Sequence, residues 1–129
     1  MSSADFLKNC VGGVVIRSAV GHGSFVDIEI DKQGNELKLW VYLAQWALMI
    51  GDREIVAADM SDDEFLKNKD LVSILQGQEI ENVDVRNGDE VHIDFSGRFR
   101  MEIWRNEQRY QRDDPIIRMF SGGRHVVDM

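Results

Sequence analysis

Histidines, one cysteine and paired carboxylates are the residues of this chain that could do chemistry. His92 and Asp94 are two apart, so on a strand both side chains would lie on one face, as a hydrolytic pair or two metal ligands would require. His22 and His125 are distant, and the sequence holds no His pair at helical spacing. A solvated strand face explains His92 and Asp94 equally well. We therefore expect no metal, no cofactor and no catalytic residue, and a hydrolase using His92 and Asp94 ranks only third among our hypotheses.

Cys10 is the only cysteine, so it cannot form an internal disulfide. We interpret it as a small buried hydrophobe in a reducing compartment. No Gly-x-Ser-x-Gly elbow and no phosphate-binding glycine loop is present, and the carboxylate pairs fall at predicted turns and helix starts. The first residues lack the apolar core of a secretion signal, and no apolar run approaches the ~20 residues that span a bilayer. These features predict a cytoplasmic protein that is not an enzyme.

Charge is sorted along the sequence. Residues 52–94 carry thirteen Asp or Glu and four Lys or Arg, whereas residues 98–124 carry seven Arg and four Asp or Glu, and the net charge of the whole chain is −8. A negative protein repels nucleic acid and anionic membranes, and its acidic region attracts cationic proteins. The residues that we expect to contact such a partner are Asp59, Asp62, Asp63, Glu64, Asp84, Asp89 and Glu90.

Five arginines follow the acidic region, at positions 98, 100, 105, 109 and 112, with Trp104 and Tyr110 between them. Arginines interleaved with aromatic residues are also typical of RNA-binding surfaces. Four interspersed carboxylates dilute this pattern, so we favour pairing of the arginines with the acidic region of the chain itself. No nucleic acid is expected as a partner.

The elements that position these residues are mostly strands in one domain, residues 1–129, with a mobile tail at about 121–129. Alternating apolar residues and the Asn87-Gly88 signal predict a hairpin meander over residues 80–104. Ser61 followed by Glu64 predicts a capped helix to about Leu75, broken near residue 68, and a second short helix with a serine cap begins the chain. The fold class is therefore α+β: an antiparallel sheet or small β-sandwich of about six to eight strands.

The predicted core consists of the inward positions of these elements, with Trp40 and Tyr42 on the outer face of a central or covered strand. Its members are Ile16, Phe25, Leu39, Val41, Leu48, Val56, Phe65, Leu75, Ile80, Ile93, Phe95, Met101 and Ile103.

Residues 46–48, 51–59, 75–83 and 94–104 carry a family likeness: a Trp-bearing strand, a turn, a strand ending near Asp, a helix, and a meander with a Ser-Gly turn. In this half of the chain the pattern resembles small bacterial α+β proteins, among them immunity proteins of polymorphic or contact-dependent growth-inhibition toxin systems. The resemblance implies a cytosolic antitoxin that binds a cognate toxin domain, many of which are basic nucleases.

The resemblance and the charge lead to one hypothesis: an immunity protein that covers the active site of a basic toxin domain with an acidic surface. The alternative is a ligand-binding β-domain without catalytic activity, in which Trp40, Trp46 and Trp104 line an interior for a small apolar molecule. The sequence leaves the toxin and the oligomeric state open.

Overall fold

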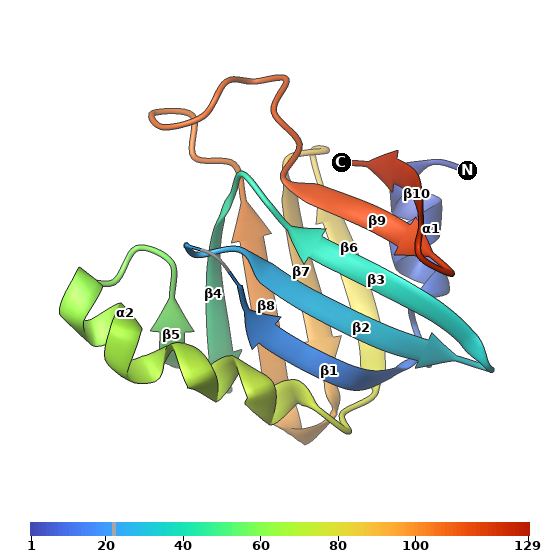
Figure 1. Cartoon of the computed structure of the whole chain (residues 1–129), viewed down its shortest axis with the longest axis horizontal. Coiled ribbons are helices and arrows are strands. Elements are labelled where there is room, and N and C mark those ends of the chain that lie inside the picture. Colours follow the sequence, from blue (N-terminus) through green and yellow to red (C-terminus); the bar gives the residue numbers. More distant parts are fainter. Residues whose placement is uncertain (22) are drawn as a thin grey trace.

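The computed structural model describes residues 1–21 and 23–129. The sequence Gly21-His22-Gly23 predicts a turn, and its central residue lies outside the described ranges. Helices and strands follow one another through the chain as Figure 1 shows. In order, the elements are α1 (Ser3–Asn9), β1 (Val14–Val20), β2 (Val26–Lys32), β3 (Asn35–Val41), β4 (Gln45–Ile50), β5 (Arg53–Ala57), α2 (Asp62–Asn68), the 3₁₀ helix η1 (Lys69–Leu75), β6 (Ile80–Arg86), β7 (Glu90–Phe95), the 3₁₀ turn η2 (Ser96–Arg98), β8 (Phe99–Trp104), β9 (Ile117–Ser121) and β10 (Arg124–Asp128).

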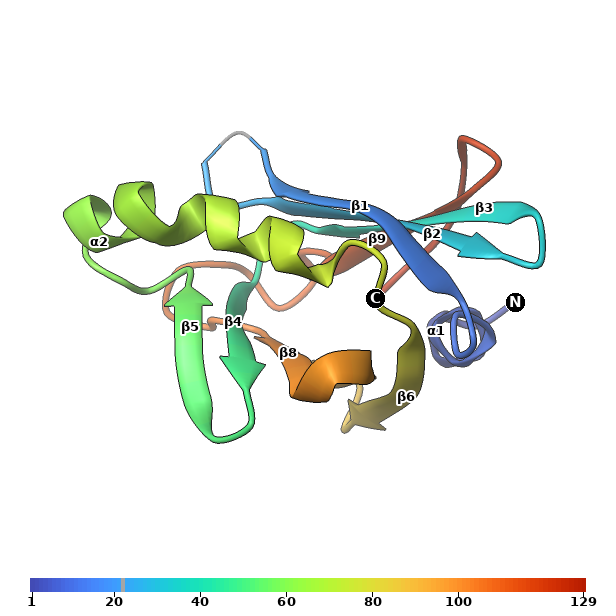
Figure 2. The ribbon, with the colours of Figure 1, turned by 90° about the horizontal axis from the view of Figure 1, so that it is seen from below.

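The strands form two antiparallel sheets of five. Sheet A has the order β1-β2-β3-β9-β10, and sheet B has the order β5-β4-β8-β7-β6. Figure 2 shows the two sheets as stacked layers, with α1 at one side and the coil of α2 and η1 along another. The predicted α+β fold, mostly antiparallel with short helices, is confirmed, although the structure has more strands than expected.

The C-terminal segment differs from the prediction. Residues 124–128 form β10, which pairs with β9 from Arg124↔Ser121 to Asp128↔Arg118. Gly122 and Gly123 have positive φ values of 58° and 80°, so they make the tight turn of a hairpin rather than a flexible linker. Residues 124–128 therefore form a paired strand where a mobile tail was predicted.

Both helices have the predicted serine caps. Ser2 Oγ accepts a hydrogen bond from the Asp5 amide at 3.1 Å, and Ser61 Oγ accepts one from the Glu64 amide at 3.3 Å. The predicted break near residue 68 is the point where α2 gives way to η1. In η1, the Val72 carbonyl accepts a hydrogen bond from Ser18 Oγ at 2.7 Å, which fixes η1 beside β1.

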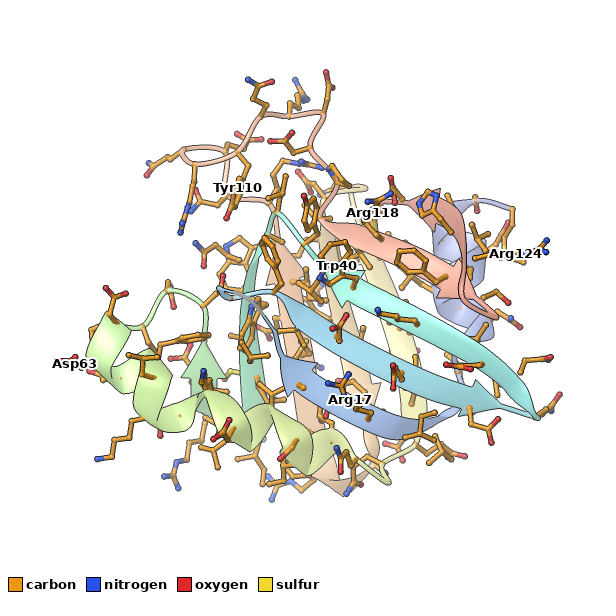
Figure 3. All side chains as sticks on the ribbon, in the orientation of Figure 1. Arg17, Trp40, Asp63, Tyr110, Arg118 and Arg124 are labelled. Carbon is orange, nitrogen blue, oxygen red and sulfur yellow. The ribbon has the colours of Figure 1, made fainter. Side chains whose placement is uncertain are left out.

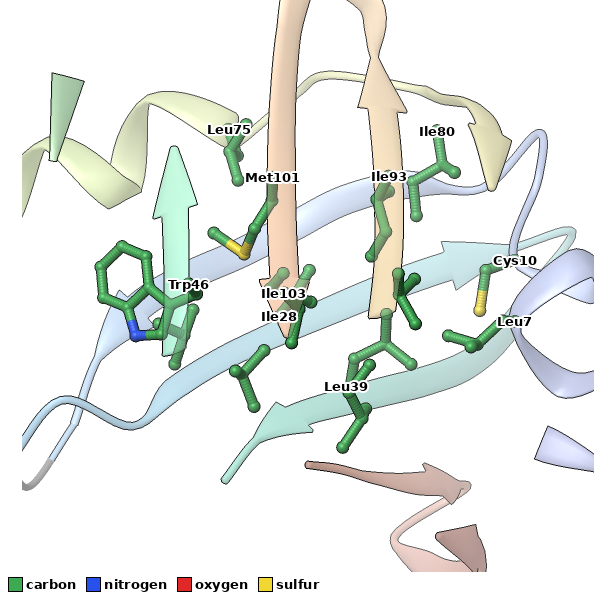
Figure 4. Packing of buried hydrophobic residues seen from close by; sticks show 14 of the residues in the cluster. Leu7, Cys10, Ile28, Leu39, Trp46, Leu75, Ile80, Ile93, Met101 and Ile103 are labelled. Atoms are coloured by element: carbon green, nitrogen blue, oxygen red, sulfur yellow. The ribbon is translucent and has the colours of Figure 1, made fainter. Parts of the chain in front are cut away.

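The core lies between the sheets (Figure 4). Most predicted core residues are buried, but Ile16 is 52% exposed because the β1–β2 register shifts between Val15 and Arg17 and leaves Ile16 as the extra residue of a bulge. Phe25 and Phe65 are only half-buried, and Val26 fills the inward position that we had assigned to Phe25.

The sheets are joined at one edge. A bridge pairs Val14 with Glu79, the Gly12 amide donates to the Ile80 carbonyl at 2.8 Å, and the Ile80 amide donates to the Gly13 carbonyl at 2.8 Å. The start of β1 thus continues into the start of β6, and the sandwich resembles a barrel opened along its other side.

Candidate functional site

The outer face of sheet B carries four charged residues of the acidic region, Asp84, Arg86, Glu90 and Asp94. Along β7, Val91 and Ile93 point into the core, so Glu90, His92 and Asp94 point outward. Strand pairing then aligns outward residues in rows across β4, β8, β7 and β6. The rows are Gln45–Trp104–Glu90–Arg86, then Ala47–Glu102–His92–Asp84, then Met49–Arg100–Asp94–Asn82.

Ion pairs already occupy much of this face. Arg86 lies 2.9 Å from Asp84 and 3.9 Å from Glu90, whose carboxylate also contacts His92 Nε2 at 2.7 Å. Asp84 and Glu90, which we expected to face a partner, are therefore engaged within the chain. These ion pairs are difficult to predict from the sequence, because the paired residues lie on neighbouring strands or two positions apart on one strand.

Arg100 makes a second group of pairs. Its Nε donates to Asp94 Oδ1 at 2.7 Å, and its Nη1 lies 3.7 Å from Glu102. The hydrogen bond and the charge of Asp94 raise the pKa of Arg100, so the guanidinium stays charged at every relevant pH. This pair agrees with the expectation that arginines meet the acidic region of the chain.

The other arginines do not follow Arg100. Arg105 donates to the carbonyls of Gln111 and Asp114, which lie in its own loop, and Arg109 lies over the Tyr110 ring at 5.6 Å. In Figures 1 and 3 this loop, residues 105–116, projects from the sandwich and carries Tyr110 away from the sheet faces. The arginine series is thus divided between sheet B and a loop, and it forms no continuous strip for RNA.

Four carboxylates at the β5–α2 junction have different surroundings. Asp59, Asp62, Asp63 and Glu64 are exposed, and in the described part of the chain no ion pair engages them. Figure 3 shows Asp63 at the outer tip of α2. We call these four residues the junction carboxylates. Three of them stand in the first turn of α2, where the helix dipole favours negative charge.

Asp59 and Asp89 come together at a recess, although thirty positions separate them. Its lining residues are Gln45, Asp59, Asp89, Trp104, Arg105, Asn106, Glu107 and Gln108. The Ala58 amide donates to the Trp46 carbonyl at 2.9 Å, which holds the end of β5 against β4. The Arg105 amide donates to the Asp89 carbonyl at 3.1 Å, which holds the β6–β7 turn against the end of β8.

The seven predicted contact residues therefore do not form one cluster. Asp59 and Asp89 share the recess above, whereas Asp62 lines a second recess with apolar Phe65 and Leu66. The residues that sequence reasoning missed are Gln45 and Trp104, which form the sheet side of the first recess. Apolar and polar residues alternate along β8, and this alternation places Trp104 on the outer face of the sheet. The pattern could have identified Trp104 from the sequence.

The remaining chemical candidates are His92, Asp94 and Cys10. His92 and Asp94 each contact other partners, Glu90 and Arg100, and within the described residues no group of three potential ligands is placed to hold a metal ion. Cys10 is buried, its Sγ donates to the Phe6 carbonyl at 3.5 Å, and burial raises the pKa of its thiol to about 12. The interpretation of Cys10 as a small buried residue is confirmed.

The three tryptophans lie in three different layers. Trp46 is buried in the core with its Nε1 donating to the Ser24 carbonyl at 2.7 Å, Trp104 is on the outer face of sheet B, and Trp40 is on the outer face of sheet A. They cannot line one interior, so the ligand-binding alternative loses the lining on which it was based.

Trp40 belongs to an aromatic group on the outer face of sheet A. Its ring centroid lies 4.5 Å from that of Tyr42 and 5.8 Å from that of Phe25, and the Arg118 guanidinium lies 6.0 Å from the Trp40 ring. Figure 3 shows Trp40 and Arg118 on the same face of the sheet. The prediction that this strand is central is confirmed, since β3 is third in the order of sheet A.

Fold and site together define a small α+β sandwich with a charged outer sheet and free carboxylates at one end. Comparisons with protein-family models, with curated proteins and with solved structures found no match to this chain. In the part of the chain that the structure describes, no helix is both long enough and apolar enough to cross a membrane.

Proposed function

We propose that this chain is an immunity-type protein that binds a basic toxin domain and neutralises it by covering its active site with acidic side chains. The observation that carries the proposal is the contrast between two sets of carboxylates. Those on sheet B are held by Arg86, Arg100 and His92, whereas the junction carboxylates form no ion pair among the described residues.

Unpaired surface carboxylates suit a cationic partner for two reasons. Their field extends about 8 Å into solution at physiological salt, which steers a basic protein and raises its association rate. Because they have no internal ion pair to break, contact with Lys or Arg of a partner costs no lost interaction. The overall charge of −8 adds to the attraction.

The partner is sought through the gene directly upstream. The proposal expects a large exported protein with a variable C-terminal domain, and that domain is the probe. Co-expression of the present chain should restore growth of cells that produce the domain, and the two proteins should co-purify. An unrelated metabolic neighbour whose product does not bind would contradict the proposal.

A charge-reversal series then tests the surface. Asp62, Asp63 and Glu64 are changed together to Lys, and we expect the association rate constant with the toxin domain to fall at least about tenfold at low salt. The dissociation rate should change less, because rim charges act mainly on encounter. Stopped-flow fluorescence at several salt concentrations measures both rates.

A matched triple reversal controls for net charge. Glu36, Glu79 and Glu81 are exposed and lie outside the junction, so changing them to Lys alters the total charge equally. The control should lower the association rate by a smaller factor. Equal rates for the two triple variants would exclude the junction carboxylates as the binding surface.

A further inference from the structure

The outer face of sheet A carries aromatic side chains that take no part in the core between the sheets. Phe25, Trp40 and Tyr42 are half-buried, and their rings contact one another with centroids 4.5–5.8 Å apart. In Figure 1 this face is turned toward the viewer, and among the described residues no helix crosses it. Aromatic rings on a solvent-facing sheet leave apolar area exposed, which is typical of an interaction surface.

Strand pairing surrounds these rings with hydrogen-bonding groups in two rows across the sheet. The first row is Asp27–Trp40–Arg118–Asp128, and the second is Arg17–Glu29–Lys38–Phe120–His125. The second row adds another aromatic contact, because the rings of Phe120 and His125 lie 5.5 Å apart. The face therefore alternates flat rings with charged side chains instead of forming one continuous apolar patch.

The charges in these two rows cancel. The ion pairs are Arg17–Glu29 at 4.0 Å, Lys38–Asp27 at 3.4 Å and Arg118–Asp128 at 3.3 Å. Three cations thus meet three carboxylates, in a chain whose net charge is −8. Asp31 and Glu36 lie one row farther from Trp40, at the hairpin end of β2 and β3. A basic protein finds no excess of carboxylates in the two rows, and a nucleic acid finds no excess of cations, so the rows match a neutral ligand.

We propose that the outer face of sheet A, with Trp40 at its centre, binds a neutral oligosaccharide. The C–H groups on a pyranose face are slightly positive and pack on the negative face of an aromatic ring. The hydroxyl groups around the sugar ring both donate and accept hydrogen bonds, which suits the guanidinium, ammonium and carboxylate groups beside Trp40. An apolar protein surface would instead bury those charged groups without hydrogen bonds, at a cost in free energy.

This surface differs from the junction carboxylates, and the inference goes beyond the proposed function. It needs no toxin for its test. The ¹⁵N-labelled protein is titrated with cellohexaose, maltohexaose and chitohexaose, and ¹H–¹⁵N spectra are recorded. We expect at least one of these sugars to bind with a Kd below about 10 mM and to shift the indole N–H of Trp40 more than those of Trp46 and Trp104. No saturable shift with any of the three, or a largest indole shift at Trp104, would overturn the inference.

Probes of other chemistry test whether the ligand is a neutral sugar. The glucosamine hexamer is cationic and hexagalacturonate is anionic, and we expect each to act on the Trp40 indole with a Kd at least about fivefold higher than the best neutral sugar. Acetyl-hexaproline-amide should also bind more weakly, because the rings of Trp40 and Tyr42 are in contact at 4.5 Å and leave no slot between them for a proline ring. Tighter binding of any of these three probes at Trp40 would assign the face to another class of ligand and refute the inference.

A matched pair of tryptophan substitutions locates the site. Trp40→Ala should raise the Kd of the best neutral sugar at least about tenfold, because the stacking surface is lost. Trp104→Ala makes the same change on the outer face of sheet B and should raise it less than about twofold. Trp40→Phe keeps a flat ring and should stay within about threefold of the wild type. Equal effects of the two alanine variants would contradict the proposed site.

A second matched pair keeps the test decisive if Trp40→Ala does not fold. Asp27→Asn with Lys38→Gln leaves the net charge unchanged and should raise the Kd about fivefold, since charge-assisted hydrogen bonds to the sugar are lost. Asp84→Asn with Arg86→Gln removes an ion pair on sheet B in the same way and should raise it less than about twofold. Circular dichroism confirms the fold of each variant, and equal Kd values for the two double variants would overturn the inference.

Discussion

Asp94 and Asp63 carry the same carboxyl group in opposite surroundings. Asp94 accepts a hydrogen bond from Arg100 at 2.7 Å, whereas Asp63 stands at the tip of α2 in open solvent. Pairs such as Asp94–Arg100 are part-exposed, so each contributes ~0–1 kcal/mol to stability. The main consequence of such a pair is that its carboxylate is unavailable to a partner, which a count of acidic residues cannot reveal.

Cys10 gives a residue-scale prediction about reactivity. Its thiol is buried and its pKa is raised from 9.0 to about 12, so almost no thiolate exists at pH 8. We expect the native protein to react with Ellman's reagent at least ~10³-fold more slowly than the urea-unfolded chain. A native rate within tenfold of the unfolded rate would contradict the packing described for α1.

The same thiol predicts a pH dependence of stability. A pKa raised in the folded state means that the folded protein holds the thiol proton more tightly than the unfolded chain does. The stability that the protonated thiol contributes is therefore fully present below pH 9 and is lost as the pH rises from 9.0 toward about 12. Cys10→Ala should be less stable at pH 7 and should lose less stability than the wild type between pH 8.5 and 10.5. Urea unfolding at each pH measures the difference, and parallel losses in the two proteins would contradict the prediction.

At the scale of elements, the junction of β1 and β6 depends on Gly13. A Cβ added there would lie 2.5 Å from Ile30 Cγ2 and 2.9 Å from the Cys10 carbonyl oxygen, and a backbone oxygen cannot move aside cheaply. Gly13→Ala should therefore lower the free energy of unfolding by ~1–3 kcal/mol. Urea denaturation followed by far-UV circular dichroism gives the value.

Gly21→Ala is the control for Gly13→Ala. The added Cβ would come no closer than 3.9 Å to the Asp27 carboxylate and the Phe25 carbonyl, which is ordinary contact. Its stability should stay within ~0.5 kcal/mol of the wild type, as for most surface changes. Equal losses for the two variants would mean that crowding at Gly13 is not the cause.

Local signals predicted elements well where one short motif determines the conformation. Asn87 and Gly88 both have positive φ, as an Asn-Gly hairpin turn requires, and Ser61 caps α2. The prediction failed at Ile16, where a bulge shifts the alternation, and after Ser121, where a glycine pair was interpreted as a flexible end. Bulges depend on pairing with another strand, so one strand's sequence does not reveal them.

The candidate site was only partly accessible to sequence reasoning. Composition indicated acidic residues and their distribution, and it identified the junction carboxylates. It could not indicate that Asp59 meets Asp89 beside Gln45 and Trp104, because that arrangement depends on the order of strands in sheet B. Nor could it separate free carboxylates from paired ones, since the pairs join neighbouring strands.

For the whole molecule, one core joins both sheets and predicts a single cooperative transition. Ile93 is fully buried in that core, so Ile93→Ala should cost ~2–5 kcal/mol. Ile16→Ala, the same change at an exposed bulge of β1, should cost less than ~1 kcal/mol. Urea unfolding is monitored by tryptophan fluorescence and by circular dichroism. Unfolding curves that differ between the two probes would contradict the single transition. Equal losses of stability in Ile93→Ala and Ile16→Ala would contradict the assignment of the core.

The order of strands has a consequence for synthesis on the ribosome. Sheet B is built from one continuous stretch, β4 to β8, whereas sheet A pairs β3 with β9, so residues 37–41 meet residues 117–121. The ribosome therefore releases all of sheet B before the strands that complete sheet A. Until β9 emerges, β3 has an open edge and a nascent chain exposes apolar residues that β9 later covers. A chain truncated near residue 110 would contain every strand of sheet B and would leave this edge of β3 without its partner.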